Sequence, residues 1–111
     1  MVGEIPDWNP RALDFVDEKE AYNWNAGFII LTMAVCREAL AHARLPMNDE
    51  TAPRTACLIG SALNGSDAYR IAMDNYTRFG PLKVSPYLLP NLCANLPAGK
   101  AGMLLGFTGP I

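Results

Sequence analysis

The chain has 111 residues, a length that suits one domain or part of one. Half of the residues are hydrophobic and only 18% are charged, which is below the roughly 25% usual in soluble domains. We therefore expect apolar surface that further protein must cover. The net charge of -2, with both signs mixed along the chain, excludes the basic footprint of a nucleic-acid-binding protein.

The chain start and the cysteines favour a cytoplasmic protein that is not associated with a membrane. Glu4 and Asp7 stand where a secretory signal would be basic and then apolar. The longest apolar run, residues 26–36, is too short to span a bilayer. Three widely spaced cysteines without a Cys-x-x-Cys motif argue against a disulfide framework and against a zinc site.

The first third of the sequence predicts an arm followed by a long helix. Residues 1–16 have no sustained hydrophobic period, so an irregular arm is expected. Asp17 and Glu20 have the spacing of a capping box, which places a helix over residues 17–45. The apolar stripe of this helix covers most of its circumference, so the helix should pack on more than one side.

A strand and a second helix are expected next. Residues 55–59 form a continuous apolar run, typical of a strand covered on both faces of an α/β layered sheet. Ser66 can begin a helix over residues 66–79, and Gly80 can end it. Because one strand cannot satisfy its own backbone hydrogen bonds, other segments or another chain should complete the sheet.

Residues 83–109 form an apolar segment that must touch protein. Lys100 is the only charged side chain after residue 83. A run of small residues would allow another backbone to approach closely, and it comprises Ala98, Gly99, Ala101 and Gly102.

The same segment resembles the stretch that precedes the active-site cysteine in β-ketoacyl-acyl-carrier-protein synthases. The landmarks are Lys83-Val84-Ser85-Pro86-Tyr87, Pro90, Asn95, Ala98-Gly99, Leu105-Gly106 and Gly109-Pro110. In that family a strand and the nucleophile elbow would follow Gly-Pro. The resemblance extends to Trp8-Asn9-Pro10, residues 17–21 and residues 57–65. It implies an α/β fold, a fragment of the thiolase-like α/β/α/β/α sandwich, with residues 1–111 as part of the N-terminal synthase domain.

Catalytic residues of such an enzyme are not expected within this chain. Condensation needs a thiolate, oxyanion-hole amides and, in the family, two histidines. Cys36 and Cys57 fall in apolar surroundings and are interpreted as structural thiols, and His42 as a surface residue at a helix end. With one histidine the family's catalytic pair cannot be assembled, and no metal or cofactor motif is present.

The resemblance implies one candidate site, which would line the acyl-chain pocket or the dimer interface. It comprises Tyr87, Leu88, Asn91, Leu92 and Cys93. The neighbours of Cys93 do not match the nucleophile motif, so Cys93 is a candidate for the pocket wall and not for the nucleophile.

The leading hypothesis is part of a 3-oxoacyl-[acyl-carrier-protein] synthase, an acyltransferase of fatty-acid or polyketide synthesis, with the isolated chain inactive. Its implied partners are an acyl carrier protein, acyl and malonyl thioesters, and the remainder of the synthase or a second subunit, in a homodimer or heterodimer. One alternative is a non-catalytic, chain-length-factor-like or scaffold subunit that pairs with a synthase. Another is an unrelated small interaction domain.

Overall fold

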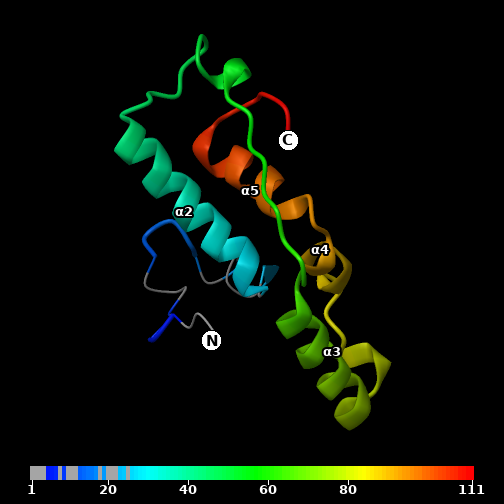
Figure 1. Ribbon diagram of the computed structural model, residues 1–111. Coiled ribbons are helices and arrows are strands. Elements are labelled where there is room, and N and C mark those ends of the chain that lie inside the picture. Colours follow the sequence, from blue (N-terminus) through cyan, green and yellow to red (C-terminus); the bar gives the residue numbers. More distant parts are fainter. Residues whose placement is uncertain (1–4, 8, 10–12, 18, 20–22, 25) are drawn as a thin grey trace.

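The computed structural model describes residues 5–7, 9, 13–17, 19, 23, 24 and 26–111. The elements with assigned bounds in this part are α2 (Gly27–Ala43), η2 (Ala52–Arg54), α3 (Ser66–Phe79), η3 (Pro81–Lys83), α4 (Leu88–Leu92) and α5 (Leu96–Leu105). Helices α2 and α5 lie side by side, and α3 lies beyond the start of α2 (Figure 1). None of the helices in the described residues has the length and apolar character that crossing a membrane requires.

The molecule is elongated, with principal extents of 50 × 29 × 27 Å. Its radius of gyration is 15.4 Å, whereas a compact chain of this length would have about 13 Å. Among the described residues, most of the buried apolar side chains fall into three small clusters, and α2 contributes to each of them through Cys36, Ile30 and Ile29 respectively. The expectation that the long helix packs on more than one side is confirmed for the first half of α2.

The start of the long helix differs from the prediction. Lys19 and Asn23 are helical, but Trp24 lies in a turn, and α2 begins only at Gly27. The proposed capping partner Glu20 lies outside the described residues, as do the arm residues Trp8 and Pro10. The predicted end is nearly right, because α2 stops at Ala43 and Arg44 closes it in the left-handed region, with φ 51.

The predicted strand over residues 55–59 is absent from the described structure. The segment is extended (Figure 1), and the Thr55 N–H is bonded back to the Ala52 carbonyl of the preceding turn, 3.3 Å. The bond that links the segment to the C-terminal residues runs from the Cys57 N–H to the Pro110 carbonyl, 3.0 Å. Gly109 lies close enough to Thr55 that a Cβ would come within 2.3 Å of the Thr55 oxygen. A strand needs repeated pairing along its length, and this single bond does not provide it.

The two later helices follow the sequence signals closely. Helix α3 has the predicted bounds and ends at Gly80, which has φ 84. Within residues 83–109, α5 packs against α2 through a face of small residues, and Ala101 is completely buried there. The expected close approach of another backbone to the small-residue run is therefore observed.

Candidate functional site

The five residues of the predicted site all belong to one short helix or flank it. Leu88, Asn91 and Leu92 lie within α4, Tyr87 precedes the helix, and Cys93 follows it. A single helical turn directs neighbouring side chains to different sides. The structure accordingly separates these residues into different environments.

Asn91 holds the start of α2 in place. Its side chain is 1% exposed, and its Oδ1 accepts a hydrogen bond from the Ala26 N–H at 3.0 Å. Its Nδ2 donates to the carbonyl oxygens of Asn23 at 2.7 Å and Tyr87 at 2.9 Å. Both amide protons and the oxygen are thus engaged with backbone groups, so this side chain serves packing and not ligand recognition.

Two further residues complete this contact, which we call the N-terminal junction (Ala26, Gly27, Gly65, Asp67 and Asn91). Asp67 Oδ2 accepts from the Gly27 N–H at 2.8 Å and thereby caps α2 from another helix. Gly65 has φ 59, and a Cβ there would come within 2.1 Å of the Asn91 carbonyl oxygen. The sequence analysis assigned no role to either Gly65 or Asp67.

Tyr87 turns toward an aromatic contact at the N-terminal side of the fold. Its ring meets Trp24 edge to face, with centroids 5.8 Å apart. The Lys100 ammonium group lies 4.8 Å from the centroid of the same Trp24 ring, a cation–π contact, and Lys100 is 9% exposed. The one charge of the C-terminal segment is therefore placed against an aromatic face.

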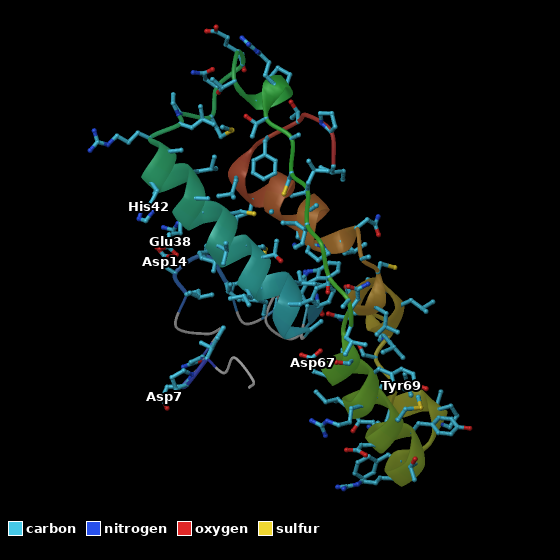
Figure 2. The ribbon with its side chains drawn as sticks, in the orientation of Figure 1. Asp7, Asp14, Glu38, His42, Asp67 and Tyr69 are labelled. Atoms are coloured by element: carbon cyan, nitrogen blue, oxygen red, sulfur yellow. The ribbon has the colours of Figure 1, made fainter. Side chains whose placement is uncertain are left out.

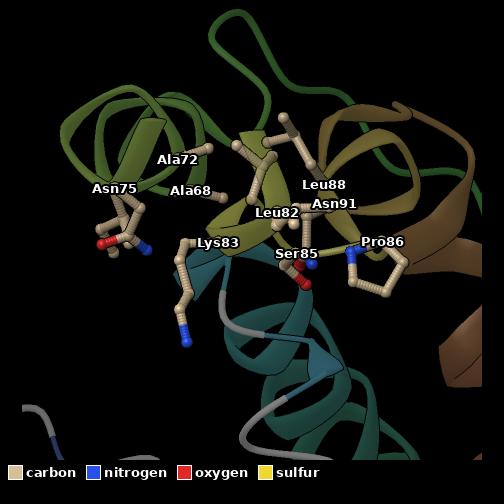
Figure 3. A pocket seen from close by; sticks show the side chains of 11 residues that line it. Ala68, Ala72, Asn75, Leu82, Lys83, Ser85, Pro86, Leu88 and Asn91 are labelled. Carbon is tan, nitrogen blue, oxygen red and sulfur yellow. The ribbon is translucent and has the colours of Figure 1, made fainter. Parts of the chain in front are cut away.

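Leu88 and Asn91 line a pocket of about 410 Å³ between α3, η3 and α4 (Figure 3). Leu82, 95% exposed, stands at its rim, and the Lys83 side chain extends away from the leucines. The remaining lining residues are Ala68, Ile71, Ala72, Asn75, Val84, Ser85 and Pro86. The groove is open, and its lining mixes apolar side chains with amide and hydroxyl groups.

Cys93 and Leu92 do not line this pocket. Cys93 is exposed, and its thiol donates to the Leu89 carbonyl oxygen at 3.3 Å. Leu92 lies against Gly65, since its Cδ2 would be 3.0 Å from a Cβ built there. Of the five predicted residues, the structure places Leu88 and Asn91 together at one pocket.

The other candidate groups lie apart from the pocket. His42 is exposed near the C-terminal end of α2, beside Glu38, whereas Asp67 lies at the opposite end of α2 (Figure 2). Cys36 and Cys57 meet with their sulfurs 4.0 Å apart, a contact that the sequence analysis did not foresee. Among the described residues, no group of three His, Cys, Asp or Glu side chains could hold a metal ion.

The described part of the chain is thus helical, with an open groove between α3, η3 and α4. Residues 13–111 match the family described as the β-ketoacyl synthase N-terminal domain. The chain therefore belongs to the β-ketoacyl synthase family, as the sequence motifs predicted.

Individual relatives agree with the family assignment. The chain is 34% identical over 110 residues to 3-oxoacyl-[acyl-carrier-protein] synthase 2 of Staphylococcus aureus strain N315, covering 99% of this chain and 26% of the relative. It is 30% identical over 112 residues to the protein of the same name from Synechocystis, covering 97% of this chain and 25% of the relative. The chain thus spans about a quarter of the length of these relatives.

Proposed function

We propose that this chain serves as part of a 3-oxoacyl-[acyl-carrier-protein] synthase. The reaction joins an acyl thioester to a malonyl thioester, forming a carbon–carbon bond as carbon dioxide leaves. The observation that carries the proposal is the match of residues 13–111 to the N-terminal synthase domain. The names of the relatives supply the substrate class, acyl groups on an acyl carrier protein.

Within this reaction the chain would shape the enzyme and would not perform the chemistry. The amide of Asn91 is fully bonded to backbone, and the exposed Cys93 thiol lies outside the pocket. Leu88 presents an apolar side chain to the groove between α3 and α4. We therefore assign to Leu88 a role in the wall of the acyl-chain pocket, and to Asn91 the positioning of α4.

Exposed apolar side chains support a covering partner, the remainder of the synthase or a second subunit. Among the described residues, Leu58 is 87% exposed, Leu63 80%, Leu82 95% and Met103 80%. Burying side chains of this size contributes roughly 1.5–3 kcal/mol each. These residues lie on several elements, so the covering protein would meet more than one face of the chain.

The test separates the isolated chain from the reconstituted enzyme. The 111-residue chain, given acyl-acyl-carrier protein and malonyl-acyl-carrier protein, should release no carbon dioxide and form no 3-oxoacyl product. Co-expression with the remaining three quarters of the Staphylococcus aureus relative should restore condensation. Turnover by the pure isolated chain would contradict the proposed role, and stable pairing without any turnover would favour a non-catalytic scaffold subunit.

A matched pair of variants in the reconstituted enzyme tests the pocket assignment. Leu88→Phe adds bulk at the groove and should shift the preference toward shorter acyl chains. Leu89→Phe adds the same bulk on a side chain that is 73% exposed and does not line the groove, so it should leave the preference unchanged. Equal product distributions for both variants would remove Leu88 from the pocket wall.

A further inference from the structure

Two cysteines from different parts of the chain meet inside the fold. Cys36 lies in α2, and Cys57 lies in the extended segment after η2. Their sulfurs are 4.0 Å apart, although the residues are 21 positions apart in the sequence. Cys93, the third cysteine, is exposed after α4 and bonded to its own helix through the Leu89 carbonyl oxygen.

The surroundings of Cys36 favour its thiol form. Cys57 is 6% exposed and packs in a cluster with Ala98, Ala101 and Phe107. Burial, followed by the charge of Cys57 and the hydrogen bond to it, raises the pKa of Cys36 to about 11. A thiol that is poorly ionised reacts slowly with oxidants, so oxidation that starts at Cys36 should need sustained exposure.

We propose that Cys36 and Cys57 form a reversible disulfide when the protein meets a peroxide, fastening the extended segment to α2. This inference does not depend on the condensation reaction proposed above. The two sulfurs would have to close from 4.0 Å to about 2.05 Å. The segment can supply this movement, because residues 55–60 belong to no helix or strand and the Cys57 N–H is bonded only to the Pro110 carbonyl oxygen near the end of the described chain.

The chemistry balances with hydrogen peroxide as the oxidant. The thiolate of Cys36, the more exposed partner, attacks one peroxide oxygen; the S–O bond forms as the O–O bond breaks, and hydroxide leaves and takes up the thiol proton as water. The Cys57 sulfur then attacks the sulfenic acid, the S–S bond forms, and a second water leaves. Two thiols are oxidised and one peroxide is reduced to two waters. A phosphine or dithiol reductant reverses the change.

The test uses the wild-type 111-residue chain, so it does not depend on a variant that folds. After peroxide treatment the thiols are alkylated with iodoacetamide in denaturant, and the intact mass is measured. The expected product has lost two hydrogens and carries one adduct instead of three. Trypsin then separates the cysteines, because residues 20–37, 55–70 and 84–100 form different peptides with one cysteine each. The expected link joins the first two.

The controls make the result specific to the folded pair. Cys93→Ser should form the same link, and tris(2-carboxyethyl)phosphine should remove it. When the chain is oxidised in urea, the Cys36–Cys57 link should no longer be the main product, because Cys93 can then form links as well. Links or intermolecular dimers through Cys93 in the native wild-type chain, or full alkylation of Cys36 and Cys57 after sustained oxidation, would overturn the proposal.

Discussion

The two ends of α2 are held by different interactions. At its start, the side chains of Asp67 and Asn91 accept hydrogen bonds from the backbone N–H groups of Gly27 and Ala26. Toward its end, Cys36 and Leu40 pack on apolar side chains, among them Ala101 of α5. The first arrangement is directional and satisfied by the chain itself, whereas the second is non-directional and continues into exposed apolar surface.

The apolar side chains beside the end of α2 include Cys57 and Phe107. We call the two segments that carry them, residues 55–61 and 107–111, the C-terminal layer. Its main-chain contacts are few, and they include bonds from the Thr108 and Gly109 N–H groups to the Ala52 carbonyl oxygen. Leu58 is 87% exposed within it. The comparison teaches that the N-terminal junction should be rigid in this chain alone, and that the C-terminal layer should gain order when further protein covers it.

The largest expected effect is from Gly65→Ala in the N-terminal junction. The new Cβ would lie 2.1 Å from the Asn91 carbonyl oxygen, and alanine resists the φ of 59. We expect a loss of at least about 3 kcal/mol in the free energy of unfolding, measured by urea denaturation followed by circular dichroism. Gly106→Ala is the matched control, since φ is 81 and nothing lies within 4 Å, so about 1 kcal/mol is expected.

Equal losses for the two glycine variants would mean that the close approach of α4 to Gly65 does not exist in solution. The N-terminal junction would then be no tighter than an ordinary helix end, and the contrast with the C-terminal layer would disappear.

Asn91→Leu tests the hydrogen bonds of the same junction. The substitution leaves the Ala26 N–H and the carbonyl oxygens of Asn23 and Tyr87 without their side-chain partner in a buried place. We expect a loss of about 2–4 kcal/mol in the free energy of unfolding, measured in the same way. Asn95→Ala, at an exposed position without a capping bond, should change it by less than about 0.5 kcal/mol.

An Asn91→Leu variant as stable as the wild type would show that the amide is replaceable by apolar packing. Asn91 would then be free for the recognition role that the sequence motif implied.

Helix α3 and the cap of α2, to which Asn91 contributes, show what the sequence could and could not predict. Helix α3 was readable because its signals are local, Ser66 at the start and Gly80 at the end. The cap of α2 was not, because Asp67 is 40 positions from Gly27 and Asn91 is 65 from Ala26. Nothing in the local sequence pairs such residues.

The strand prediction was wrong for a related reason. A continuous apolar run reports burial, but a strand also needs partners for its backbone groups. Residues 55–59 include the buried Cys57, yet also the exposed Leu58, and the bonds of Thr55 to Ala52 and of Cys57 to Pro110 do not form a strand ladder. For the candidate site, the motif pointed to the segment around α4, and its role as a site stays a prediction. The division of its side chains between pocket, junction and surface depends on tertiary packing, which the motif does not contain.

Gly109→Ala tests the same kind of close contact in the C-terminal layer. A Cβ there would come within 2.3 Å of the Thr55 carbonyl oxygen, nearly as close as at Gly65. Because this layer has few main-chain bonds, it can shift to relieve the contact, and we expect a loss of only about 1–2 kcal/mol in the free energy of unfolding. Urea denaturation beside Gly65→Ala measures the difference. A loss as large as that for Gly65→Ala would show the two regions to be equally rigid.

The smallest effect concerns the ion pair between Arg37 and Asp14 on the outer side of α2. The hydrogen bond from Arg37 lowers the pKa of the Asp14 carboxyl below its ordinary value of 3.8. In the unfolded chain that pKa returns to the ordinary value, so unfolding favours protonation. The stability that the pair contributes is therefore fully present above this value and is lost as the pH falls through the lower pKa of the folded state.

Comparing the wild type with Asp14→Asn in urea, from neutral pH into this acid range, measures the contribution. The difference should be small because both side chains are exposed, and it should vanish in acid. Arg37 also lies 5.1 Å from the centroid of the Phe15 ring, a contact that does not titrate in this range. Arg37→Met should therefore remain destabilised in acid where Asp14→Asn is not. A difference for Asp14→Asn that stays constant with pH would instead assign its effect to the turn around residue 14.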